Sequence, residues 1–60
     1  MKLNDQVALI TGAGSGIGEA IAIGFAKTGA KLVCADKNLT GAEKTANTIL
    51  KNNGNAIAIK

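Results

Sequence analysis

The sequence lacks several of the side chains on which protein chemistry most often depends. It contains no His, Tyr, Trp, Arg or Pro among its 60 residues, and only one Cys and one Phe. One Cys and no His exclude an internal disulfide and a zinc site of the usual ligands. The single aromatic residue excludes a stacking surface for single-stranded nucleic acid. We therefore expect no metal site and little equipment for chemistry within these residues.

The charged residues point to an ordinary solvated surface. Seven lysines give a net charge of +3, but they are spread along the whole chain. A nucleic-acid site would cluster them on one face, so we expect no nucleic-acid partner. No apolar run approaches the roughly 18 residues of a membrane span, and no signal-peptide core precedes Asp5 and Gln6. We expect a cytoplasmic protein without membrane contact.

The length and the composition do not match those of a complete domain. A chain this short buries only about 60% of its unfolded surface, yet 47% of its residues are hydrophobic. That composition is too apolar for a disordered segment. We therefore expect residues 1–60 to be the N-terminal part of one larger domain, with no second domain among them.

Apolar runs alternate with segments of helical periodicity. Residues 7–10, 31–35 and 56–59 predict strands, and the absence of polar alternation is typical of a parallel sheet. Residues 19–28 predict a helix that ends at Gly29. Its apolar stripe, of the kind that packs on a core, consists of Ile17, Ile21 and Phe25.

A second helix is predicted before the turn at residues 52–55. Its N-cap is either Asn38 or Thr40, because Thr40 and Glu43 have the spacing of a capping box. The apolar positions at helical spacing are Leu39, Ala42, Ala46, Ile49 and Leu50. The positions predicted to face away are Lys44, Thr45, Asn47, Thr48 and Lys51.

The predicted order is strand, helix, strand, helix, strand, which belongs to the α/β class with a parallel sheet. Right-handed crossovers place both helices on one face of that sheet. The expected spatial order of the strands is third, second, first. One apolar face of the sheet stays bare.

The turn after the first strand has the composition of a phosphate-binding loop. Four glycines fall within residues 12–18, directly before a helix whose N-terminus offers free amides and partial positive charge. Gly12 would turn the chain off the strand, Gly16 would admit a pyrophosphate, and Gly18 would let the helix pack tightly. Ser15 offers a hydroxyl and an amide. The alternative is a glycine-rich connection without a ligand.

Asp36 ends the second strand and is the other informative residue. A carboxylate there can accept hydrogen bonds from both hydroxyls of an adenosine ribose and would repel a 2′-phosphate, which favours NAD over NADP. The alternative is that Asp36 caps the following helix. Lys37 leaves the cofactor choice open, because a cation there could tolerate a 2′-phosphate.

Residues 11–18, Thr-Gly-Ala-Gly-Ser-Gly-Ile-Gly, resemble the T-G-x-x-x-G-x-G fingerprint of the short-chain dehydrogenase/reductase family, and Asp36 matches the acid of its NAD-preferring members. The resemblance implies a Rossmann-type sheet, of which this βαβαβ unit is the first half of a doubly wound fold. It implies an oxidoreductase that moves hydride between NAD(P) and an alcohol or carbonyl substrate, and a homo-oligomer at full length.

The resemblance also assigns site residues. Those implied to line the pyrophosphate are Gly12, Ser15, Gly16, Ile17 and Gly18, with Asp36 at the adenosine ribose and Lys37 beside it. The family's catalytic Ser, Tyr and Lys would fall beyond Lys60, so no catalytic residue is expected here. The alternative is a free-standing nucleotide-binding or interaction module without catalysis.

Overall fold

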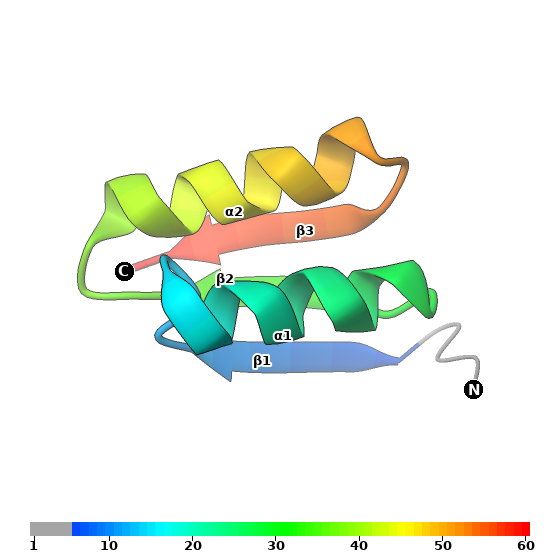
Figure 1. Cartoon of the computed structure of the whole chain (residues 1–60), viewed down its shortest axis with the longest axis horizontal. Helices are drawn as coiled ribbons and strands as arrows, with labels where there is room; N and C mark the ends of the chain where they lie inside the picture. The colour runs from blue at the N-terminus through cyan, green and yellow to red at the C-terminus, as the bar shows by residue number, and fades with distance from the viewer. Residues whose placement is uncertain (1–5) are drawn as a thin grey trace.

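The computed structural model describes residues 6–60, so Asp5 and the residues before it, which enter the signal-peptide argument, lie outside the described part. The elements in chain order are β1 (Val7–Thr11), α1 (Gly16–Lys27), β2 (Lys31–Ala35), α2 (Leu39–Lys51) and β3 (Asn55–Ile59). The predicted βαβαβ order is confirmed (Figure 1). Neither α1 nor α2, the helices among residues 6–60, has the length and apolar character of a membrane span.

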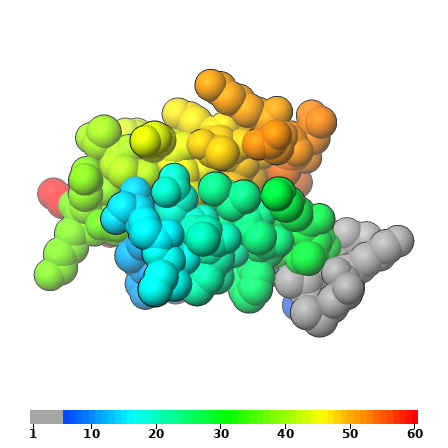
Figure 2. Space-filling view, viewed as in Figure 1, coloured from blue at the N-terminus to red at the C-terminus, as the bar shows by residue number. Residues whose placement is uncertain are grey.

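The three strands form one parallel sheet with β2 in the centre. Val7 of β1 pairs with Lys31 of β2, and Lys31 pairs in turn with Asn55 of β3. The predicted strand order is therefore confirmed. Figure 1 shows both helices in front of the sheet, and Figure 2 shows them side by side across that face, α1 in cyan to green and α2 in yellow-green to orange.

The covered face of the sheet carries a core built mostly from small side chains. Its buried members are Ala13, Ala22, Ala30, Leu32, Cys34, Ala42, Ala46 and Ile49. The opposite face is bare, as predicted: Val7, Leu9 and Ile57 are 68%, 61% and 60% exposed. Burial raises the pKa of the Cys34 thiol, in agreement with a core rather than a reactive residue.

Helix α1 packs through small residues and not through the predicted apolar stripe. Ile17, Ile21 and Phe25 are all exposed, whereas Ala22 is fully buried. A Cβ on Gly18 would collide with the carbonyl of Gly12, so the small residues at helical spacing from Gly18 mark the face nearest the sheet. The prediction of a core-facing stripe was wrong because backbone proximity, not side-chain size, decides which face is buried.

The ends of α1 follow known capping rules. The helix begins at Gly16, three residues before the predicted start, directly after Ser15, which is its N-cap in extended conformation. At the other end, Gly29 has a φ of +97° and the Ala30 amide donates to the Phe25 carbonyl at 3.3 Å. This Schellman-type ending confirms Gly29 as the predicted stop.

Helix α2 corrects one prediction and decides between two others. The Asn38 side chain accepts a hydrogen bond from the Gly41 amide at 3.2 Å, so Asn38 and not Thr40 is the N-cap. Thr45 was predicted to face away but is fully buried, between Ala42 and Ala46. The reason is that its hydroxyl finds a buried acceptor, the Ala13 carbonyl, at 2.7 Å.

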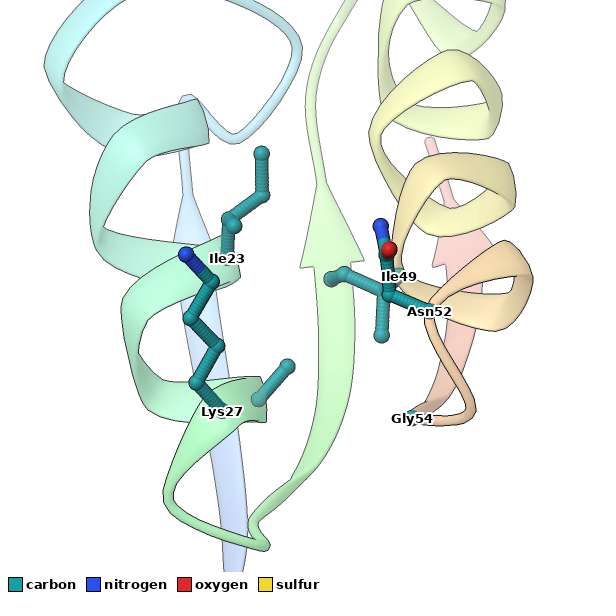
Figure 3. A pocket seen from close by; sticks show the side chains of 6 residues that line it. Ile23, Lys27, Ile49, Asn52 and Gly54 are labelled. Carbon is teal, nitrogen blue, oxygen red and sulfur yellow. The ribbon is translucent and has the colours of Figure 1, made fainter.

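A small cavity of about 40 Å³ lies between the C-terminal ends of α1 and α2, lined by side chains that include Ile23, Lys27 and Ile49 (Figure 3). That volume holds little more than water, so this is a packing defect and not a ligand site. At its edge, a Cβ on Gly54 would lie 2.7 Å from Ile49 Cγ2 and 3.1 Å from the Ile49 carbonyl oxygen. The return from α2 to β3 therefore requires glycine.

Two glycine substitutions should change stability in opposite directions. Gly54→Ala should destabilise the complete protein by about 1–3 kcal/mol, because the new methyl overlaps Ile49. Gly24→Ala should stabilise it by about 0.4–1 kcal/mol, since Gly24 is helical and a Cβ there meets no described atom within 4 Å. Urea unfolding of both variants measures the difference. Equal stability of the two variants would contradict the packing at Gly54.

Candidate functional site

The candidate site lies at the edge of the sheet where the three strands end. Because the strands are parallel, the turns after β1 and β2 and the residue after β3 meet at this edge, on the left in Figure 1. Both helices also begin there, at Gly16 and Leu39. The edge therefore combines two loops with the positive ends of two helix dipoles.

The glycine loop, residues 12–18, has backbone angles that glycine permits. Gly12 and Gly16 have φ values of +67° and +60°, a region that other residues rarely adopt. A Cβ at either position would meet no described atom within 4 Å. The loop therefore leaves open space over its backbone at these two positions, whereas Gly18 is pressed against the Gly12 carbonyl.

The N-terminus of α1 is ready to receive an anion. Ser15 is the N-cap, in extended conformation, and its side chain makes no capping hydrogen bond. The first amides of a helix have no acceptor within the helix, so those of Gly16, Ile17 and Gly18 are available to a ligand. Ser15 and Ile17 are exposed beside them. Amides, dipole and open space together fit a phosphate group.

Asp36 joins the two loops of the site. One carboxylate oxygen accepts from the Gly14 amide at 2.8 Å, and the other accepts from the Asn38 amide at 3.0 Å. The amides of Asn38, Gly14 and Lys37 hold the pKa of Asp36 below its ordinary value. An ionised carboxylate has about four acceptor positions, so it can still accept from the hydroxyls of a ligand. Asp36 is not the cap of α2, because Asn38 fills that role.

An open groove of about 410 Å³ runs along this edge. Its lining residues are Thr11, Gly12, Ala35, Asp36, Lys37 and Lys60. The structure therefore brings Gly12, Asp36 and Lys37 together in one groove. Ser15, Gly16, Ile17 and Gly18 do not line it, and instead form the adjacent N-terminus of α1.

Sequence reasoning missed Lys60 as a groove residue. Its position directly after β3 was a signal that could have identified it.

Sequence reasoning also missed the support that α2 gives to the glycine loop. A Cβ on Gly14 would lie 2.7 Å from Asp36 Oδ2 and 3.2 Å from the Ala42 amide nitrogen, and a Cβ on Gly41 would lie 3.0 Å from the Gly14 carbonyl oxygen. The two backbones touch, and no sequence pattern of either segment alone announces such a contact.

Comparison with known proteins agrees with this geometry. Residues 6–60 match the family model for short chain dehydrogenases. A cyclohexanol dehydrogenase of Acinetobacter sp. (strain SE19) is 48% identical over 59 residues, covering 98% of this chain and 24% of the relative. The 7α-hydroxysteroid dehydrogenase of Escherichia coli K12 is 42% identical over 60 residues, with 100% and 24% covered. The chain thus spans about a quarter of the length of the curated relatives it matches.

Solved structures give the same answer. A 7α-hydroxysteroid dehydrogenase in complex with NADH and 7-oxo glycochenodeoxycholic acid superposes with a TM-score of 0.93 at 43% identity, over 97% of this chain and 23% of that one. An Agrobacterium tumefaciens protein assigned as a 2-deoxy-d-gluconate 3-dehydrogenase, with bound NADP, gives 0.89 at 43%, with 97% and 23% covered. The sheet, the glycine loop and the matched family model lead to one conclusion: the chain belongs to the short-chain dehydrogenase family.

Proposed function

We propose that these residues hold the adenosine diphosphate half of a nicotinamide dinucleotide in an oxidoreductase. The observation that carries the proposal is the pairing of an open, amide-lined helix start with an anchored carboxylate on the next loop. The amides of Gly16, Ile17 and Gly18, with Ser15 beside them, would bind the pyrophosphate, and Gly12 would leave room for it. Asp36 would accept the two ribose hydroxyls.

NAD is the preferred cofactor in this proposal. The Asp36 carboxylate is held ionised by backbone amides, and a 2′-phosphate placed against it would be repelled. Lys37 and Lys60 line the same groove and moderate that repulsion. The solved relatives include one with NADH and one with NADP, so the family accommodates both. We expect a preference for NAD and not exclusion of NADP.

The complete protein, in this proposal, transfers hydride between the dinucleotide and an alcohol or carbonyl substrate. The supporting observation is that the relatives are dehydrogenases of about four times this length, which favours the enzyme over a free-standing binding module. Residues 1–60 would be the N-terminal part of one dinucleotide-binding domain, and the complete protein a homo-oligomer. No catalytic residue is assigned to this part of the chain.

The role of Asp36 can be tested by substitution in the complete protein. Asp36→Ala should raise the dissociation constant for NADH about tenfold to a hundredfold, because charge-assisted hydrogen bonds to the ribose are lost. NADPH binding should change less, so the preference for NADH narrows. Glu43→Ala removes the same charge from the exposed face of α2 and should leave both constants unchanged. Fluorescence titration measures them, and unchanged NADH affinity in the Asp36 variant would remove the ribose role.

The same carboxylate predicts how binding depends on pH. The pKa of Asp36 in the folded protein lies below its ordinary value of 3.8. Its contribution to folding stability is therefore fully present above pH 3.8 and is lost as the pH falls through the pKa of the folded state. The carboxylate that would bind the ribose stays ionised above that same pKa. NADH affinity should therefore show no Asp36 titration between about pH 5 and 8. Titrations across that range in wild type and Asp36→Asn check this, and a transition present only in the wild type would contradict it.

The open space at Gly16 predicts a separation of binding from stability. Gly16→Ala places a methyl over the loop where the pyrophosphate would lie and also strains a φ of +60°. Gly29→Ala introduces comparable strain at a φ of +97°, remote from the loop. Both variants should lose about 1–2 kcal/mol of stability, but only Gly16→Ala should bind NADH at least about tenfold more weakly. Equal binding by the two variants would count against a pyrophosphate site at this loop.

A further inference from the structure

The hydroxyl of Thr45 is committed to the glycine loop. It donates to the Ala13 carbonyl oxygen at 2.7 Å, across 32 residues of sequence, and both residues are fully buried. A threonine within a helix more often donates to the carbonyl one turn earlier. Thr48 in the same helix does so, to Lys44 at 3.0 Å. Thr45 and Thr48 of α2 therefore use the same group for different purposes.

The Thr45 bond fixes one side of a peptide group whose other side faces Asp36. The peptide joining Ala13 and Gly14 is trans, so its carbonyl and its amide point in opposite directions. The carbonyl accepts from Thr45 at 2.7 Å, and the Gly14 amide donates to Asp36 Oδ2 at 2.8 Å. Thr45 and Asp36 thus hold the two ends of one dipole.

Without the hydroxyl, this orientation would lose its restraint. The Ala13 carbonyl would be a buried acceptor without a partner, which is costly. Gly14 follows it, and glycine permits rotations of the peptide that other residues resist. A rotated peptide would turn its carbonyl oxygen toward Asp36 and withdraw the amide that holds the carboxylate. The hydroxyl therefore determines which end of the dipole the carboxylate meets.

We propose that Thr45 is a positioning residue for the dinucleotide site: its hydroxyl locks the Ala13–Gly14 peptide so that the Gly14 amide holds Asp36 toward the ribose of the cofactor. The inference rests on the proposed function and assigns Thr45 no contact with the ligand. It predicts that Thr45 acts on binding through Asp36.

The test uses NADH as the probe and the complete protein. Thr45→Val keeps the branched shape and removes the hydroxyl, and should raise the NADH dissociation constant about threefold to tenfold. Thr45→Ser retains the hydroxyl and should bind within about twofold of wild type. Thr48→Val is the matched control, because it removes a helix hydroxyl that does not contact the loop, and should leave binding unchanged.

A double-mutant cycle separates positioning from general destabilisation. In the Asp36→Ala background, Thr45→Val should change NADH affinity less than about twofold, since the residue through which it acts is gone. If the two substitutions weaken NADH binding independently, so that their fold-changes multiply in the double variant, the inference is overturned. Wild-type NADH affinity in Thr45→Val would also overturn it. If Thr45→Val does not fold, Thr45→Ser and Thr45→Ala differ by one hydroxyl oxygen, and equal affinity of that pair would overturn it.

Failure of the proposed function would look different. A wild-type protein that does not bind NADH at all would refute the dinucleotide site itself, and the positioning role with it. A wild type that binds NADH, with Thr45→Val and Thr48→Val indistinguishable from it, would refute only the role of Thr45.

Discussion

The candidate site depends on the hydrogen bonds that the Asp36 carboxylate accepts from two backbone amides. The carboxylate ties the Gly14 amide of the loop after β1 to the Asn38 amide at the start of α2, with bonds of 2.8 and 3.0 Å. Each oxygen takes one amide, so the carboxylate cannot rotate without breaking both. The two loops are then a single unit, and an ionised acid stands at a defined place beside the free amides of α1.

This arrangement requires backbones to touch, and that requirement explains the small residues around it. Gly18 lies against the Gly12 carbonyl, and Gly41 lies against Gly14. Alanine fills most of the neighbouring core. Larger side chains would separate the helices from the sheet and move the Gly14 amide out of reach of Asp36. The same constraint turns Ile17, Ile21 and Phe25 outward, because the inner face of α1 has no room for them.

The sequence was sufficient to predict the elements and the loop, since apolar runs, glycine spacing and caps are local signals. With consecutive strands side by side, as the structure has them, the right-handed sense of the crossovers places both helices on one face of the sheet. The buried faces of the helices were harder to predict. Thr45 lies at helical spacing between Ala42 and Ile49 and so falls on the buried stripe, but a polar residue is usually placed outside. Its burial depends on the Ala13 carbonyl, a backbone acceptor that composition cannot reveal.

In the proposed function, the electrostatics of this edge suit two kinds of ligand group. A diphosphate carries negative charge and suits amides at a helix start, where the dipole is positive. A diol is neutral and suits a carboxylate with two free acceptor positions. These preferences conflict if the acid moves toward the diphosphate, because like charges would then repel. In the proposed site, the Ala13–Gly14 peptide limits that conflict, because its amide donates to Asp36 and restrains the acid, while its carbonyl accepts from Thr45 of α2. In the proposed site, the placement of the acid relative to the diphosphate therefore depends on the orientation of one peptide group.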